Sequence, residues 1–105
     1  MESIAISIVE VDQAGILRLR QNIGVDENYE HIYRTASAVR WLREERMLTT
    51  VSLQGWPQSR CFRQILEAVQ SEYGHILKLT PDTQWVNVSS EDRKTIVDAA
   101  NETAV

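Results

Sequence analysis

Alternating isoleucines near the start of the chain restrict its fold more than any other feature of the sequence. Residues 3–11 run Ser-Ile-Ala-Ile-Ser-Ile-Val-Glu-Val, which puts Ile4, Ile6 and Ile8 on one side of an extended backbone. The run is also rich in β-branched residues, which favour strands. The fold must therefore contain a β-sheet with one apolar face.

A turn and a second alternating segment follow this strand. Residues 12–15, Asp-Gln-Ala-Gly, have turn composition, and residues 16–20 then alternate Leu17 and Leu19 with arginines. The two segments together predict an antiparallel hairpin with one apolar and one wet face. Residues 21–28 contain a glycine, an aspartate and two asparagines, which indicates a loop.

The second half of the chain begins with a helical pattern that has a clear start and stop. Apolar residues recur at i, i+3, i+4, i+7 and i+11, namely Phe62, Ile65, Leu66, Val69 and Tyr73. Pro57 suits the first position of a helix, and Gly74 suits the left-handed residue that ends one. These signals predict an amphipathic helix over residues 57–73.

Two extended segments and a final helix are expected after it. Residues 75–80 form a predicted strand closed by a proline-aspartate turn, and residues 85–88 form a second, shorter extended segment. Ser89 or Ser90 caps a helix whose first turn carries two carboxylates. The apolar stripe of this helix comprises Ile96, Val97 and Ala100.

Residues 28–52 give conflicting signals about secondary structure. Apolar spacing predicts a short helix over residues 28–36. The segment after Trp41 has good helix formers, yet Val39 and Trp41 alternate with their neighbours as in a strand. A hairpin folded at residues 44–46 accounts for both halves of residues 38–52 and is favoured, although no glycine or asparagine supplies the usual two-residue turn.

Composition and charge describe one small acidic domain. The chain has 105 residues, of which 43% are hydrophobic and 25% charged, as is typical of a globular protein. A chain of this length supports a single core, so we expect one domain over residues 1–105. Its 11 lysines and arginines against 15 aspartates and glutamates give a net charge of −4, which disfavours nucleic acid as a partner.

Three observations predict a cytoplasmic protein without a membrane segment. The N-terminal Met-Glu-Ser-Ile lacks the basic region of a signal peptide. The sequence has no run of 18 apolar residues that could form a transmembrane helix. The single cysteine, Cys61, fits a reducing compartment because it cannot form an internal disulfide.

The sequence contains no recognisable set of catalytic, cofactor-binding or metal-binding residues. Cys61 has no histidine near it in the sequence, and neither His31 nor His75 has a further ligand at zinc spacing. The four glycines are isolated, so no phosphate-binding loop is expected. We therefore expect no catalytic residue, no cofactor and no metal ion.

Aromatic and arginine side chains are the best candidates for a functional surface. Tryptophan and arginine are favoured at interfaces because they bury a large area and keep a polar group available. The candidate binding surface, termed the arginine–aromatic surface, comprises Tyr33, Arg34, Arg40, Trp41, Arg43 and Trp56. It would suit an anionic ligand or an acidic partner. The alternative is that the tryptophans close a small core.

Three stretches of the sequence resemble a known group of proteins. Residues 27–36, Glu-Asn-Tyr-Glu-His-Ile-Tyr-Arg-Thr-Ala, lead to Val-Arg-Trp at 39–41, and residues 79–88 run Leu-Thr-Pro-Asp-Thr-Gln-Trp-Val-Asn-Val. They are similar to segments of small uncharacterised bacterial proteins encoded in mobile integron gene cassettes. The resemblance implies a soluble, oligomeric α+β protein with a Trp-bearing hairpin after the first stretch. Leu42 departs from the polar turn residue expected there, and no activity is implied.

These observations predict an α+β fold: an antiparallel sheet of four to six strands with two main helices packed on it. The first functional hypothesis is a non-enzymatic binding or adaptor protein that acts through the arginine–aromatic surface, as a homodimer or with another protein partner. The second is an immunity- or antitoxin-like protein whose acidic surface neutralises a basic partner. The third is a small enzyme or ligand carrier with a pocket near His31, Tyr33 and Arg40.

Overall fold

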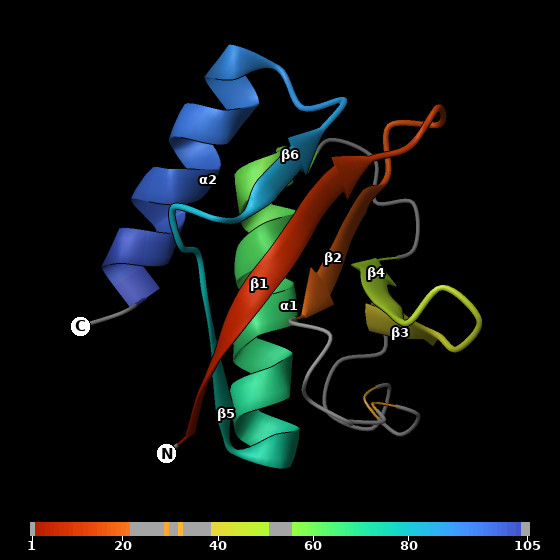
Figure 1. The fold of residues 1–105 in the computed structure, drawn as a ribbon, viewed down its shortest axis with the longest axis vertical. Coiled ribbons are helices and arrows are strands. Elements are labelled where there is room, and N and C mark those ends of the chain that lie inside the picture. The colour runs from red at the N-terminus through yellow and green to blue at the C-terminus, as the bar shows by residue number, and fades with distance from the viewer. Residues whose placement is uncertain (1, 22–28, 30–31, 33–38, 51–55, 104–105) are drawn as a thin grey trace.

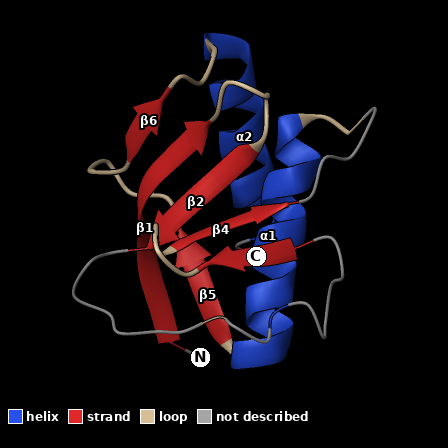
Figure 2. Cartoon of the chain, turned by 90° about the vertical axis from the view of Figure 1, so that its right-hand side faces the viewer, coloured by secondary structure: helices blue, strands red, loops and turns tan. Residues whose placement is uncertain are grey.

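A computed structural model of the chain describes residues 2–21, 29, 32, 39–50 and 56–103 (Figure 1). The elements in this part of the chain are β1 (Glu2–Val11), β2 (Leu17–Gln21), β3 (Val39–Leu42), β4 (Met47–Thr50), α1 (Gln58–Tyr73), β5 (His75–Lys78), β6 (Gln84–Val86) and α2 (Ser90–Thr103). The six strands form one sheet, and Figure 2 shows both helices on the same side of it. The predicted α+β class, with two helices packed on a sheet, is confirmed.

The first two strands form the predicted antiparallel hairpin, and its turn is held by Asp12. One carboxylate oxygen of Asp12 accepts hydrogen bonds from the backbone N–H groups of Ala14 and Ile16, each at 2.9 Å. Gly15 adopts a left-handed conformation with φ of 81°. The turn composition therefore fixes the position of the hairpin.

The apolar face of β1 differs from the predicted one because the strand contains a bulge. The pairing with β2 shifts between Ile6 and Ile8, and the Ser7 hydroxyl donates to the carbonyls of Arg20 and Gln21 there. A bulge reverses the alternation of the residues that follow it. Val9 is accordingly fully buried and Ile8 only partly so, which corrects the prediction that Ile8 shares the face of Ile4 and Ile6.

The second hairpin, β3 with β4, settles the conflict for residues 39–50, whereas residues 38, 51 and 52 lie outside the described part of the chain. The strands pair from Val39 with Thr50 to Leu42 with Met47, and residues 43–46 form the turn. Arg46 has a φ of 54°, so it takes the left-handed position that glycine or asparagine usually fills. The hairpin prediction is confirmed for the described residues 39–50.

Most of the helix predicted over residues 28–36 lies outside the described residues. Tyr29 and Ile32 are described, and both are buried in the core. The Ile32 N–H donates to the Tyr29 carbonyl at 3.0 Å, and the Tyr29 hydroxyl donates to the side-chain oxygen of Gln21. The bond to Gln21 attaches Tyr29 to the end of β2.

α1 begins within one residue of the predicted start and ends where the sequence predicts, and α2 begins at the predicted cap. Pro57 is the N-cap of α1, and Gly74, with φ of 74°, ends it by donating its N–H to the Gln70 carbonyl. The Ser89 hydroxyl accepts the Asp92 N–H at 3.1 Å at the start of α2. None of the helices in the described part of the chain has the length and apolar character needed to span a bilayer.

The sheet is mixed, not antiparallel throughout as predicted. Its strand order is β3-β4-β2-β1-β5, and β6 pairs with β1 off this path. Both β5 and β6 run parallel to β1, with β5 beside its first half and β6 beside its second half. Parallel neighbours need a long crossover connection, and α1 lies in the connection that leads to β5.

Candidate functional site

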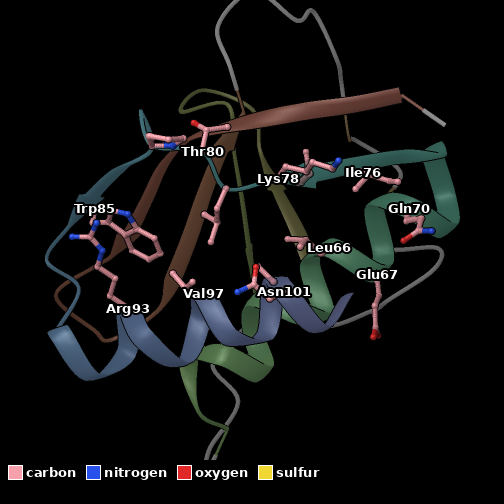
Figure 3. A pocket seen from close by; sticks show the side chains of 14 residues that line it. Leu66, Glu67, Gln70, Ile76, Lys78, Thr80, Trp85, Arg93, Val97 and Asn101 are labelled. Atoms are coloured by element: carbon pink, nitrogen blue, oxygen red, sulfur yellow. The ribbon is translucent and has the colours of Figure 1, made fainter. Parts of the chain in front are cut away.

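A cavity of about 420 Å³ lies between β5, α1 and α2 (Figure 3). Its volume falls within the range of roughly 300 to 1,000 Å³ that is usual for ligand sites. Leu66 of α1 and Leu77 of β5, both buried, contribute apolar surface to it. The side chains of α2 that line it are Arg93, Val97, Ala100 and Asn101.

The cavity exists because α2 uses only part of its apolar stripe to pack on α1. Ile96 is fully buried in the core, whereas Val97 and Ala100 are only partly buried and line the cavity. Residues 93, 97, 100 and 101 follow helical spacing, so they share one face of α2. This face looks across the cavity toward β5.

Arg93 and Trp85 lie at one end of the cavity. The guanidinium carbon of Arg93 is 5.1 Å from the centroid of the Trp85 ring, which is a cation–π distance. Trp85 lies on β6 and is half-buried, and its position on that strand is set by pairing with Val9. The guanidinium is thus held next to an apolar space at the protein surface.

The segment that leads to Trp85 is fixed by a buried threonine. The Thr83 hydroxyl donates to the Ile6 carbonyl at 2.7 Å and accepts the Thr80 N–H at 2.9 Å. Farther along, the Asn87 side chain donates to the Val11 carbonyl at 2.8 Å. These bonds join the β5–β6 turn and the residue after β6 to β1, so this end of the cavity has a defined shape.

The charged side chains that line the cavity are Glu67, Lys78 and Arg93. Two cations and one carboxylate make this region locally positive, although the whole chain has a net charge of −4. In Figure 3 the Glu67 side chain points away from the space between β5 and α2. The cavity thus has an apolar wall and a cation at one end. This combination suits a ligand with an apolar body and an anionic group.

The predicted arginine–aromatic surface is only partly described, and its described members do not share one face. Arg40 is exposed, whereas Trp41, the next residue of β3, is half-buried and packs edge-to-face on Tyr29 with ring centroids 5.3 Å apart. Neighbouring residues of a strand point to opposite faces, so Arg40 and Trp41 are separated. Arg43 is exposed in the β3–β4 turn.

The remaining members of that surface lie elsewhere. Trp56 is half-buried before α1, and the guanidinium carbon of Arg60 lies 3.8 Å from the centroid of its ring. Tyr33 and Arg34 are outside the described residues, as are His31 and Tyr33 of the predicted pocket near Arg40. All three tryptophans are partly buried and pack against the core.

Sequence reasoning singled out none of the cavity residues as a site. The nearest signal is the apolar stripe of α2, and such a stripe ordinarily indicates only packing on a core. Trp85 enters the sequence analysis only within the stretch 79–88, because its cation–π contact with Arg93 joins two elements whose approach no local pattern reveals. Lys78 gave no signal, since a charged residue in a strand usually marks only a solvated face.

Comparisons with known proteins give two matches. The family model described as Integron Cassette Protein Hfx_Cass5 matches residues 4–83. A solved structure described as "Structure from the mobile metagenome of North West Arm Sewage Outfall: Integron Cassette Protein Hfx_Cass5" is 31% identical in sequence, and the match covers 96% of this chain and 98% of that chain, with a TM-score of 0.46. No curated protein matches the chain. The predicted resemblance to integron cassette proteins is confirmed.

Proposed function

The chain belongs to the Hfx_Cass5 family of integron cassette proteins, and we propose that it is a non-enzymatic binding protein whose site is the cavity between β5, α1 and α2. The observation that carries the proposal is that one cavity of about 420 Å³ combines apolar surface with an arginine at cation–π distance from Trp85. Apolar surface removed from water provides affinity, while a fixed charge orients the ligand.

The charge distribution favours an anionic group on the ligand. Arg93 lies at one end of the cavity, at cation–π distance from the Trp85 ring, and Lys78 lies along the β5 side of the cavity. Neither cation forms an ion pair with any residue that the structure describes. A carboxylate or sulfonate joined to an apolar body complements this arrangement.

The proposal keeps the binding role of the first hypothesis and moves it from the arginine–aromatic surface to the cavity. Cytoplasmic location, a homodimer and a protein partner remain predictions from the sequence. An immunity-like role also remains a prediction from the sequence. That role needs an acidic contact surface, and we assign no group of described residues to one.

The proposal is tested with 1-anilinonaphthalene-8-sulfonate, which joins an apolar ring system to a sulfonate. We expect one saturable site per chain in a fluorescence titration. Val97→Phe fills the cavity and is expected to weaken binding at least tenfold, whereas Thr95→Phe, on an exposed position of α2 outside the cavity, leaves it unchanged. Urea unfolding curves verify that both variants are folded.

Two results would contradict the proposal. One is the absence of saturable binding to the unmodified chain. The other is equal binding by folded Val97→Phe and Thr95→Phe variants, which would place the probe outside the cavity. Either result counts against the cavity as the site.

A further inference from the structure

The strand that lines the cavity stands at the edge of the sheet. β5 pairs with β1 along one side, and no strand of the described chain pairs with its other side. An edge strand leaves the N–H and C=O groups of alternate residues without a ladder partner. Within Ile76 to Lys78, β5 therefore presents backbone donors and acceptors along this edge.

This edge borders the cavity. Four consecutive residues, Ile76 to Leu79, line it. Side chains of a strand alternate between two faces, so a cavity above one face would meet only every second residue. Contact with three successive residues of β5, Ile76 to Lys78, and with Leu79 directly after the strand is expected of a cavity along the edge of β5 that faces away from β1. Figure 3 shows the same arrangement, with β5 in teal and α2 in blue on opposite sides of the space.

We propose that the ligand is an extended peptide segment of a protein partner, which adds as a new strand to the free edge of β5 between that strand and α2. This inference rests on the proposed function, since it uses the same cavity. A small molecule can fill the apolar space, but only a peptide also satisfies a row of strand-edge hydrogen bonds. The backbone groups supply affinity, and the cavity selects the side chains.

The lining predicts which side chains the peptide carries. Leu66 and Val97 offer an apolar contact surface, which suits an aliphatic β-branched residue because such residues also favour extended backbone. Arg93 at the end of the cavity suits an aspartate or glutamate. The predicted motif is thus a short β-prone run with one acidic residue.

The first experiment is selection from a phage-displayed library of random hexapeptides against the full chain. We expect enriched peptides to contain aliphatic β-branched residues together with an acidic residue, and to compete with 1-anilinonaphthalene-8-sulfonate. If no peptide is enriched while the sulfonate probe still binds, strand addition is wrong and the proposed function stands. If the sulfonate probe itself fails to bind, the proposed function fails.

The second experiment places the change on the peptide, so that folding of the protein is unaffected. Synthetic copies of an enriched peptide are N-methylated at single backbone nitrogens and titrated calorimetrically. A strand bound along one edge directs alternate N–H groups to its neighbour. We expect methylation at alternate positions to weaken binding at least tenfold and methylation at the positions between them to have little effect.

Amide hydrogen exchange identifies the edge that is used. Bound peptide is expected to slow exchange of the outward amides within residues 76–79 by at least tenfold and to leave β3, at the opposite edge of the sheet, unchanged. The proposal would be overturned if exchange slowed at β3 instead. It would also be overturned if N-methylation left the peptide affinity unchanged at every position.

Discussion

The guanidinium of Arg93 lies 5.1 Å over the indole ring of Trp85 and so joins α2 to β6 at one end of the cavity. A guanidinium at cation–π distance from an aromatic ring keeps N–H groups that are able to bind an anion. The pair thus combines two roles. It closes one end of an apolar space, and it presents a positioned cation to a ligand inside that space.

The charge of Arg93 is expected to contribute to binding of an anionic probe. Arg93→Gln should weaken binding of 1-anilinonaphthalene-8-sulfonate about threefold, because an exposed charge pair contributes roughly 0.2–1 kcal/mol. Fluorescence titration measures the affinity. Lys94→Gln is the matched control, since it removes the same charge from an exposed neighbouring position of α2 that does not line the cavity. Equal losses of probe affinity in the two variants would show that binding depends on the net charge of the protein and not on the position of Arg93.

Two neighbouring residues of α2 should differ sharply in their contribution to stability. Ile96→Ala is expected to lower the free energy of unfolding by about 3 kcal/mol, because the side chain is fully buried. Val97→Ala should cost only about 0.8 kcal/mol, since its half-buried side chain lines the cavity. Urea denaturation measures both values. Similar losses would mean that Val97 is packed as tightly as Ile96 and that the cavity is closed.

The hydrogen bonds of Thr83 should hold the β5–β6 turn on β1. Thr83→Val removes the hydroxyl that bonds Ile6 and Thr80, and it is expected to lower the free energy of unfolding by about 2 kcal/mol because the Ile6 carbonyl and the partly buried Thr80 N–H lose this hydrogen bond. Thr83→Ser keeps the hydroxyl and should recover more than half of that loss. Thermal and urea unfolding test this difference, which an effect of side-chain volume alone would not produce.

Gly74 ends α1 in a conformation that a side chain disfavours. Gly74→Ala is expected to cost about 1–2 kcal/mol, purely from the left-handed backbone, because an added Cβ meets no atom within 4 Å. Gly74→Asn should cost less, since asparagine tolerates this conformation better. If urea unfolding shows no loss for the alanine variant, the helix does not end in the left-handed conformation described here.

Most of the fold followed from local patterns in the sequence. Pro57 and Gly74 marked the limits of α1, and the turn composition of residues 12–15 marked the first hairpin. The bulge in β1 was missed because it arises from pairing with β2, which moves Val9 into the core position predicted for Ile8. Local alternation cannot reveal a shift that a neighbouring strand imposes.

Local sequence patterns could not predict the candidate site. Its cavity depends on parallel pairing of β5 with β1 and on the way α2 rests on α1, and both are contacts between distant segments. The sequence pointed to Trp41 and Arg40 because aromatic and cationic residues adjoin there. Adjacent residues of a strand face opposite ways, so the structure separates that pair and unites Trp85 with Arg93.

The central claim is that ligands bind in the cavity between β5, α1 and α2, and NMR mapping tests it most directly. The chain is labelled with ¹⁵N and titrated with 1-anilinonaphthalene-8-sulfonate. We predict that the amides of residues 76–80, the indole N–H of Trp85 and the amides of Val97 and Ala100 shift together along one saturable curve. Saturable shifts centred on Arg40, Arg43 and Trp56, with those of the cavity unchanged, would contradict the account.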